Sequence, residues 1–441
     1  MLILIEQKKY NEAHARLKEL NVVDIADWLN DIEEDPRILI VFRLLPKEMA
    51  AEVFAYLSHD MQQKIVESLT DKELARIVDE LFLDDAVDFL DEMPASIVKR
   101  VIRAADPETR IHINQLLMYP EHSAGSLMTI EFMELDDIWT VQRAIEAIRS
   151  QSKDKESIAT LYVTDHQRHL EGVISLREVL VAKNDDKIGD LMETDVIKAK
   201  THDDQADVAD VFKKYDLISM PVVDNENRLV GIITIDDVVD VMEEETTEDI
   251  YKMAAMSPSE DGYMHTGVLT LAKNRVVWLI VLMVSATFTG LIISRYDAAL
   301  AANVLLASFI PMLMDTGGNA GSQASVSIIR GITLGEIKFS DIFTVMWKEF
   351  RVSLLVSAGV AVVNFARIWI MNGDPLIAAV VSLTLIVTIV AAKLVGCTLP
   401  LLADKIGLDP ALMASPLITT IVDAVALVVF FNIAILLLPG M

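Results

Sequence analysis

Apolar residues recur at helical spacing in the first part of the chain, as in Met49, Val53, Phe54 and Leu57. Residues three and four apart lie on one face of a helix, so each such run predicts a helix with one buried face. Short polar turns such as SHDM and LTDKE separate the runs. The pattern predicts an all-α N-terminal helical domain at residues 1–122, built from short antiparallel helices.

After residue 122 the pattern changes to strand and helix in alternation, and it occurs twice. Each copy has a leading Leu-Met pair, a helix, an apolar strand, a polar turn and a second strand with a glycine, Gly172 or Gly231. A closing helix follows. The repeat predicts two α/β units, at residues 123–187 and 188–245.

The second unit runs into an acid-rich segment, DDVVDVMEEETTEDI, which predicts a helix connecting it to the rest of the chain at residues 240–272. Asp237, Asp240 and Glu244 fall on one face of this helix, where like charges repel. Such a stripe is acceptable as a solvated face, or is stabilised when a hard divalent cation bridges its carboxylates. Both interpretations stay open here.

Five apolar segments follow, at residues 275–294, 298–329, 345–371, 376–402 and 411–438. Each is long enough to cross a bilayer, so residues 273–441 are predicted to form a five-helix α transmembrane domain. Lys and Arg flank the ends that share a side with the N-terminus, and the chain begins without a signal-peptide pattern. We expect a cytosolic N-terminus and, after five crossings, an extracytoplasmic C-terminus.

Charge is divided unevenly between the two halves of the chain. Residues 1–270 hold 28 Lys and Arg against 57 Asp and Glu, a net charge of −29, whereas the rest is nearly neutral. A surface this acidic repels nucleic acid and attracts multivalent cations. Acidity that serves only solubility is the alternative interpretation.

Asp423 lies in the middle of the last apolar segment, PLITTIVDAVALVVFFNIAILLL, with no other charged residue in that stretch. An ionised group in a bilayer is costly, so an intramembrane Asp indicates a water-filled path or a bound cation. The alternative is a structural carboxylate held by the hydroxyls of Thr419 or Thr420, which are otherwise candidates to line the same path.

The second apolar segment contains PMLMDTGGNAGSQASVSIIRG, which is unusually small and polar for a membrane span. Glycine and serine alone favour close helix packing. Asp315, Asn319 and Gln323 add oxygen ligands at helical spacing, which favours a wet, pore-lining face.

The two α/β units resemble a tandem pair of CBS domains, most closely in SMPVVDNENRLVGIITIDDVV. The resemblance implies a module that dimerises and binds adenine nucleotides or cations, so ATP is an expected ligand. Asp236 in TIDDV matches the position that contacts a ribose. The same segment can cap the following helix, so the two roles are weighed equally.

The whole chain resembles the MgtE magnesium channel family in its order of parts and in the motif P-x-x-x-D-T-G-G-N-A-G-S-Q. The resemblance implies a homodimer in the cell (inner) membrane, with Asp423 at a pore site for Mg²⁺ and with cytosolic Mg²⁺ closing the pore. The acidic residues that match its regulatory metal ligands are Glu52, Asp84, Asp88, Asp204, Asp216, Asp237, Asp240, Glu245, Glu248 and Asp409.

These features favour a Mg²⁺-selective uptake channel over an enzyme. No His is followed by Glu, which excludes an H-E-x-x-H metalloprotease, and no Gly-Lys pair exists for a Walker A loop. A protein that only senses Mg²⁺ conflicts with the polar residues in the membrane. The remaining alternative is a secondary transporter that couples divalent cations to Na⁺ or H⁺ through Asp315 and Asp423.

Overall fold

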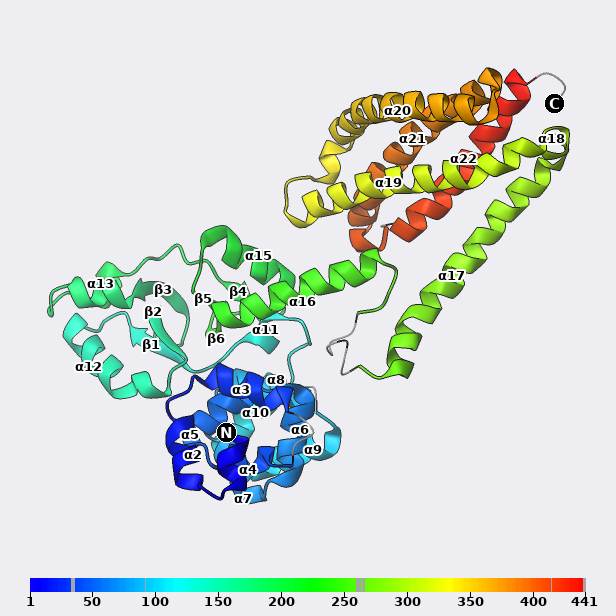
Figure 1. Ribbon diagram of the computed structural model, residues 1–441. Coiled ribbons are helices and arrows are strands. Elements are labelled where there is room, and N and C mark those ends of the chain that lie inside the picture. Colours follow the sequence, from blue (N-terminus) through cyan, green and yellow to red (C-terminus); the bar gives the residue numbers. More distant parts are fainter. Residues whose placement is uncertain (33–35, 92, 259–262, 264–265, 414, 439–441) are drawn as a thin grey trace. The chain divides into compact units, whose positions relative to one another are not determined.

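The structure is a computed structural model that describes residues 1–441 except 33–35, 92, 259–262, 264–265, 414 and 439–441 (Figure 1). The chain divides into two compact units, Met1–Met242 and Glu243–Met441.

The N-terminal part of the first unit is all-α, as predicted. Phe54 and Phe89 meet edge to face in its core, with ring centroids 5.0 Å apart. Local signals begin several helices, such as the capping box of Thr70 and Glu73. The described helices of this part are α1 (Leu2–Glu6), α2 (Tyr10–Leu17), α3 (Val22–Asp31), α4 (Ile38–Arg43), α5 (Lys47–Ala55), α6 (His59–Ser68), α7 (Asp71–Val78), α8 (Leu83–Asp91), α9 (Ala95–Ala104) and α10 (Pro107–Leu116).

The two α/β repeats each form a three-stranded sheet, in which the first strand is parallel and the third antiparallel to the middle one. The first repeat contains α11 (Ala124–Leu127), β1 (Phe132–Asp136), α12 (Val141–Gln151), η1 (Ser152–Asp154), β2 (Ser157–Thr164), β3 (Leu170–Ser175) and α13 (Leu176–Val181). The second contains α14 (Ile188–Leu191), β4 (Ala199–Lys200), α15 (Gln205–Tyr215), β5 (Ser219–Val223) and β6 (Leu229–Thr234). The predicted repeat is confirmed.

The leading Leu-Met segment of each repeat packs on the sheet of the other repeat. Thr129 and Ile232 exchange backbone hydrogen bonds of 2.8 and 2.9 Å, and a Cβ added at Gly231 would lie 2.6 Å from the sulfur of Met128. In the other repeat, a Cβ added at Gly172 would lie 2.7 Å from the sulfur of Met192. The repeated methionine and glycine of the sequence therefore form part of the contact that joins the two repeats.

The helix that leaves the second repeat is α16 (Ile235–Met253), so it begins and ends earlier than the predicted segment 240–272. Ala255 takes a left-handed φ of 52°, and the Met256 N–H turns back to the Tyr251 carbonyl. Pro258 follows and cannot continue a helix. Residues 259–262 and 264–265 of the predicted segment lie outside the described residues.

Five long helices of the second unit match the predicted transmembrane domain: α17 (Val268–Arg295), α19 (Ile310–Thr333), α20 (Ile342–Asn372), α21 (Pro375–Lys405) and α22 (Ser415–Leu437). Among the described residues, four helical stretches are long and apolar enough to span a membrane, and α19 is not one of them. Its Asp, Asn, Gln and Gly residues lower its apolarity.

The second span was predicted at 298–329, and its first part is not continuous with α19. The segment instead forms α18 (Asp297–Ala302) and η2 (Val304–Phe309). Asn303 between them is extended, and its side chain accepts the Leu305 N–H at 3.2 Å. This local cap offers the backbone an alternative to the helix, which is why the long span breaks there.

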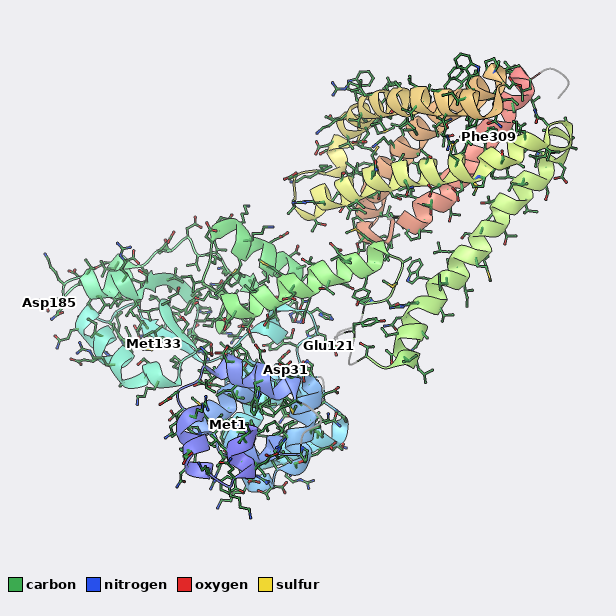
Figure 2. All side chains as sticks on the ribbon, viewed as in Figure 1. Met1, Asp31, Glu121, Met133, Asp185 and Phe309 are labelled. Atoms are coloured by element: carbon green, nitrogen blue, oxygen red, sulfur yellow. The ribbon has the colours of Figure 1, made fainter. Side chains whose placement is uncertain are left out.

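Within the second unit, α19 packs against α21 and α22, and α20 packs against α21. Phe309, labelled in Figure 2, belongs to the apolar core that these helices share. Two short 3₁₀ segments complete the unit, η3 (Phe339–Asp341) and η4 (Pro410–Met413). The η4 segment packs against α19, α21 and α22 just before α22 begins.

Candidate functional site

The glycines of α19 face its neighbouring helices. A Cβ added at Gly317 would lie 2.7 Å from Thr388 of α21, and one at Gly318 would lie 2.8 Å from Thr419 of α22. Gly396 of α21 approaches α19 still more closely, because a Cβ there would overlap the carbonyl oxygen of Gly321. The small residues therefore allow close helix packing, as one of the two interpretations of this segment held.

The polar residues of α19 lie on a different face of the same helix. Asp315, Asn319 and Gln323 are all exposed, at successive intervals of four residues. Asp423 of α22 is partly buried, and its carboxylate is close enough to that of Asp315 for the two to interact electrostatically. The two interpretations of the segment are thus compatible, since glycines pack inward while a polar stripe stays open.

The hydroxyls of Thr419 and Thr420 do not hold the Asp423 carboxylate. Both donate to the carbonyl oxygen of Pro416, at 2.9 and 3.1 Å. The interpretation of Asp423 as a structural residue fixed by these threonines is therefore not supported. An acidic side chain that neither threonine holds is left beside the polar stripe of α19.

A second group of carboxylates lies where the N-terminal helices meet the α/β repeats. Glu131 accepts the Leu83 N–H that starts α8, at 2.9 Å, and its carbonyl accepts the Glu156 N–H just before β2, also at 2.9 Å. Asp237 at the start of α16 accepts from the Thr234 hydroxyl at 2.9 Å. We call the residues gathered here the acidic cluster: Asp84, Asp85, Glu131, Glu156, Asp236 and Asp237.

Burial and the neighbouring carboxylates raise the pKa values of four members of the acidic cluster, Asp84, Asp85, Glu156 and Asp237. Burial, with added repulsion from Asp236 and Asp85, raises the pKa of Glu156 to about 8. Burial also raises the pKa of Asp85 to about 6, and those of Asp84 and Asp237 well above the usual range. The Oε2 atom of Glu156 is buried without a hydrogen-bond partner in the described residues. Protonation or a bound cation would lower the repulsion among such buried carboxylates.

Five other predicted regulatory residues are not among the six residues of this cluster, although Asp88 repels Asp85. Glu52 on α5, Asp88 on α8 and Asp240 on α16 are exposed. Asp204 caps the start of α15 by accepting the Ala206 N–H at 2.9 Å, and Asp216 ends the same helix in a left-handed conformation. The last two residues therefore have local structural roles at opposite ends of one helix.

The remaining predicted regulatory residues lie in the second unit, together with a lysine. Lys252 of α16 forms ion pairs with Glu248 at 2.8 Å and with Asp409, just before η4, at 2.7 Å. Burial, with repulsion from Asp409, Glu245 and Glu248, raises the pKa of Asp249 to about 6 despite the nearby Lys252. Asp249 thus has three acidic neighbours and one basic neighbour, Lys252.

These groups match Mg²⁺ in the type of ligand atom that they offer, but not in a placement that would surround the ion. Among the described residues, no three His, Cys, Asp or Glu side chains are placed so as to hold a metal ion together. The donors are all carboxylate oxygens, which Mg²⁺ prefers, and Mg²⁺ commonly keeps most of its waters and takes one or two carboxylates. The residues present therefore suit a hydrated Mg²⁺ ion.

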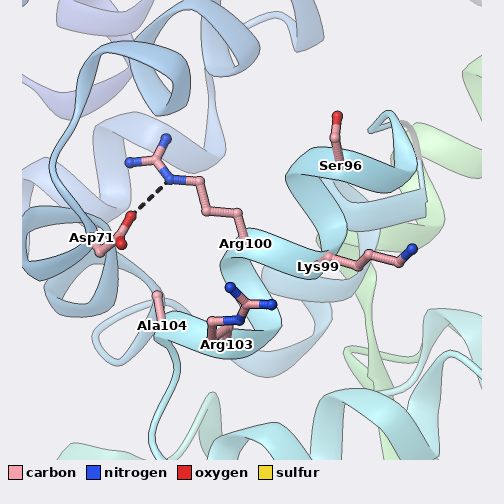
Figure 3. A pocket seen from close by; sticks show the side chains of 6 residues that line it. All are labelled: Asp71, Ser96, Lys99, Arg100, Arg103 and Ala104. Atoms are coloured by element: carbon pink, nitrogen blue, oxygen red, sulfur yellow. Dashed lines mark hydrogen bonds and ion pairs between the residues drawn. The ribbon is translucent and has the colours of Figure 1, made fainter.

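A pocket of about 200 Å³ on α9 has the opposite charge, with Lys99, Arg100 and Arg103 around it (Figure 3). The Arg100 guanidinium is committed to the fold, because it pairs with Asp71 at 2.8 Å and donates to the carbonyls of Val66 and Leu69. Arg100 in this pocket therefore links α9 to the end of α6 and the start of α7.

Comparison with known proteins decides the family. A family described as "Divalent cation transporter", MgtE, matches residues 310–433, its intracellular N domain matches residues 20–122, and the CBS domain matches residues 188–244. The "Magnesium transporter MgtE" of Thermus thermophilus is 36% identical over 428 residues, covering 96% of this chain and 94% of the relative. The chain belongs to the MgtE family. The MgtE protein of Bacillus subtilis is 30% identical and covers 98% of this chain and 96% of its own length.

A solved structure supports the fold of the soluble part of this MgtE chain. The crystal structure of the soluble part of a magnesium transporter matches with a TM-score of 0.52 and 29% identity, over 55% of this chain and 96% of that one. The predicted multidomain architecture, with N-domain, tandem CBS domains and helical membrane region, is therefore confirmed.

The sequence marks Asp84, Asp85 and Asp88 as an acidic stripe, but it did not identify two members of the acidic cluster, Glu131 and Glu156. Asp85 lies inside the acidic run of α8, and Glu156 lies in the charged insertion QSKDKES of the first repeat. Both segments are rich in charged residues, which could be recognised from the sequence. Nothing in the order of residues indicated that α8 and the start of β2 share Glu131 as a hydrogen-bonding partner.

Proposed function

We propose that this chain is a Mg²⁺-selective channel for magnesium uptake across the cell (inner) membrane. The observation that carries the proposal is the open polar stripe of Asp315, Asn319 and Gln323 on a membrane-domain helix, beside Asp423 of α22. A stripe of this kind is unfavourable against lipid and needs water or protein beside it. The relatives named as magnesium transporters supply the cargo, and transport changes no covalent bond, so no enzymatic role is proposed.

The stripe would be covered by a second copy of the chain in a homodimer. A two-fold axis along the pathway brings two copies of Asp423 and of the α19 stripe together. Mg²⁺ gives up its waters reluctantly, so the carboxylates and the side-chain carbonyls of Asn319 and Gln323 would act on the hydrated ion. Five crossings, with Lys and Arg at the ends that share a side with the N-terminus, would put the N-terminus in the cytosol and the C-terminus outside.

Cytosolic Mg²⁺ would close this pathway by neutralising the carboxylates of the soluble part. Asp84 and Asp237, from α8 and α16, repel each other in the acidic cluster, and an ion between them would hold these elements together. Glu248 and Asp409 would do the same between α16 and η4. Glu52, Asp88, Asp204, Asp216, Asp240 and Glu245 remain predicted ligands that further ions or a second copy would complete.

ATP at the CBS repeats, with Asp236 as its ribose contact, also remains a prediction. Asp236 is exposed, but it contributes to the negative charge of the acidic cluster. A triphosphate beside this cluster would need a cation such as Mg²⁺ to offset the repulsion.

The test is Mg²⁺ influx into proteoliposomes that contain the purified chain and a Mg²⁺-sensitive dye. Asp423→Asn is expected to abolish selective influx while the variant still folds. Asp374→Asn is the matched control, because Asp374 only caps α21 by accepting the Leu376 N–H at 2.8 Å, a role that Asn also fills. Normal influx through Asp423→Asn would rule out the proposed pore site.

The proximity of Asp315 and Asp423 also favours a second candidate, a transporter that couples divalent cations to H⁺ or Na⁺. Two neighbouring intramembrane carboxylates can exchange a proton for a cation. The same proteoliposomes separate the two candidates when no Na⁺ or H⁺ gradient is supplied. Influx driven by the Mg²⁺ gradient alone supports the channel, and influx that needs an added gradient supports coupled transport.

A further inference from the structure

Lys252 lies between two carboxylates, those of Glu248 and Asp409. Its ammonium lies 2.8 Å from Glu248 Oε1, one turn earlier on α16, and 2.7 Å from Asp409 Oδ2. The contact with Asp409 crosses from α16 to the residue that precedes η4. The three side chains are partly shielded from solvent, with exposures of 22% for Lys252, 36% for Glu248 and 29% for Asp409. The ion pairs are therefore less screened than those of a fully exposed lysine.

The charge around this lysine is not balanced. Asp409, Glu245 and Glu248 each repel the Asp249 carboxylate, and Lys252 attracts it. Lys252 brings one positive charge to a place where Asp249 has three acidic neighbours. A divalent cation binds several carboxylate oxygens at once. A lysine ammonium has only three N–H donors to offer to the same oxygens.

The contact is continuous with the membrane helices. Asp409 also accepts the Ala411 N–H at 2.8 Å, which fixes the start of η4. The carbonyl of Met413, at the end of η4, accepts the Ser325 hydroxyl of α19 at 3.2 Å. The ion pair therefore bears on the short segment that leads from α21 into α22, the helix that carries Asp423.

We infer that Lys252 is a tethered cation that holds α16 against η4 when no divalent cation is bound, and that Mg²⁺ replaces its ammonium between Glu248 and Asp409. The inference rests on the proposed function, because it takes these two carboxylates as ligands of cytosolic Mg²⁺. Lysine supplies one positive charge to the contact and the ion supplies two. The contact thus exists at low Mg²⁺ in a weaker form and becomes stronger as Mg²⁺ rises.

The test is hydrogen exchange of the full-length chain in proteoliposomes, followed by mass spectrometry of peptides that cover α16 and η4. Without divalent cations, Lys252→Met is expected to exchange about tenfold faster than wild type at residues 243–253 and 410–413, because a charge-assisted contact is lost. Added Mg²⁺ should restore wild-type protection. Lys252→Arg keeps the charge and should stay close to wild type.

Lys213→Met is the matched control, since it removes the same charge from an exposed position of α15. Two results would overturn the inference: unchanged exchange in Lys252→Met without divalent cations, or faster exchange that Mg²⁺ does not reverse. A purely structural lysine gives the second result. Mg²⁺ influx measured in parallel on wild type tests the proposed function separately, because exchange at these peptides is read whether or not the chain conducts.

Discussion

Glu349 of α20 and Lys393 of α21 form a buried ion pair, with Oε2 and Nζ 3.5 Å apart and side chains that are 15% and 6% exposed. An unpaired charge among membrane helices is costly, so each residue makes the other tolerable. The pair joins the two helices about one turn from the place where α21 crosses α19 at Gly396. The ion pair therefore helps to fix the position of α21 between α20 and α19.

Removal of either partner is expected to destabilise the membrane unit. Glu349→Gln leaves the Lys393 ammonium buried without a counter-charge, at a cost of about 3 kcal/mol in the free energy of unfolding. The double variant Glu349→Gln/Lys393→Met removes both charges and should recover at least half of the loss. Thermal unfolding of the purified chain in detergent measures both effects.

Glu336→Gln is the control, because Glu336 is exposed in the loop after α19. The prediction fails if the double variant is as unstable as the summed single variants, since the two charges would then act independently.

The close approach of α19 and α21 predicts a strict size limit at Gly396. Gly396→Ala places a methyl group against the Gly321 carbonyl, so the helices must separate. We expect a loss of about 2 kcal/mol in stability and a loss of Mg²⁺ influx, because the polar stripe lies on the displaced helix. Gly290→Ala on α17 is the matched control, since nothing lies within 4 Å of its added Cβ. Equal behaviour of the two variants would contradict the packing role.

Periodicity predicted the elements well where local and tertiary forces agree. The Leu-Met pair and the glycine of each repeat form the same kind of contact, Met128 on Gly231 and Met192 on Gly172. The repeat could therefore be recognised from the sequence. The break at Asn303 was missed because apolar content alone extends the span, whereas the Asn side chain caps the next segment. The end of α16 at Met253 was missed although Pro258 marks it.

The candidate sites were predictable in composition but not in arrangement. Asp423 and the α19 stripe follow from the cost of polar groups in a membrane, which is a property of single helices. The acidic cluster depends on α8, β2 and α16 meeting, and Lys252 depends on Asp409, which is remote in sequence. Only tertiary packing brings such groups together.

The acidic cluster predicts that stability falls as pH rises when no divalent cation is present. The folded chain holds protons on Asp85 up to about pH 6 and on Glu156 up to about pH 8, whereas the ordinary pKa values are 3.8 and 4.5. Their contribution is therefore complete near pH 4 and is lost as pH rises through those two folded-state values. Thermal unfolding of the chain in chelator, from pH 5 to 9, should show a steady decrease.

Glu156→Gln should remove the part of this decrease that lies between about pH 6 and 8, with a gain of about 2 kcal/mol at pH 9. Mg²⁺ replaces the protons, so its stabilising effect should be larger at pH 8.5 than at pH 6. A pH profile identical to wild type would show that Glu156 does not hold the proton.

The polar stripe predicts that Asn319 contributes to conduction as well as Asp423. Asn319→Leu replaces a carbonyl oxygen by an apolar group on the exposed face of α19, so the hydrated ion loses one partner. The loss of one hydrogen bond to a charged species corresponds to about tenfold slower Mg²⁺ influx in proteoliposomes. Asn372→Leu is the matched control, because Asn372 is another exposed asparagine, at the end of α20. If both variants conduct like wild type, the stripe does not line the path of the ion and another surface of the membrane unit must do so.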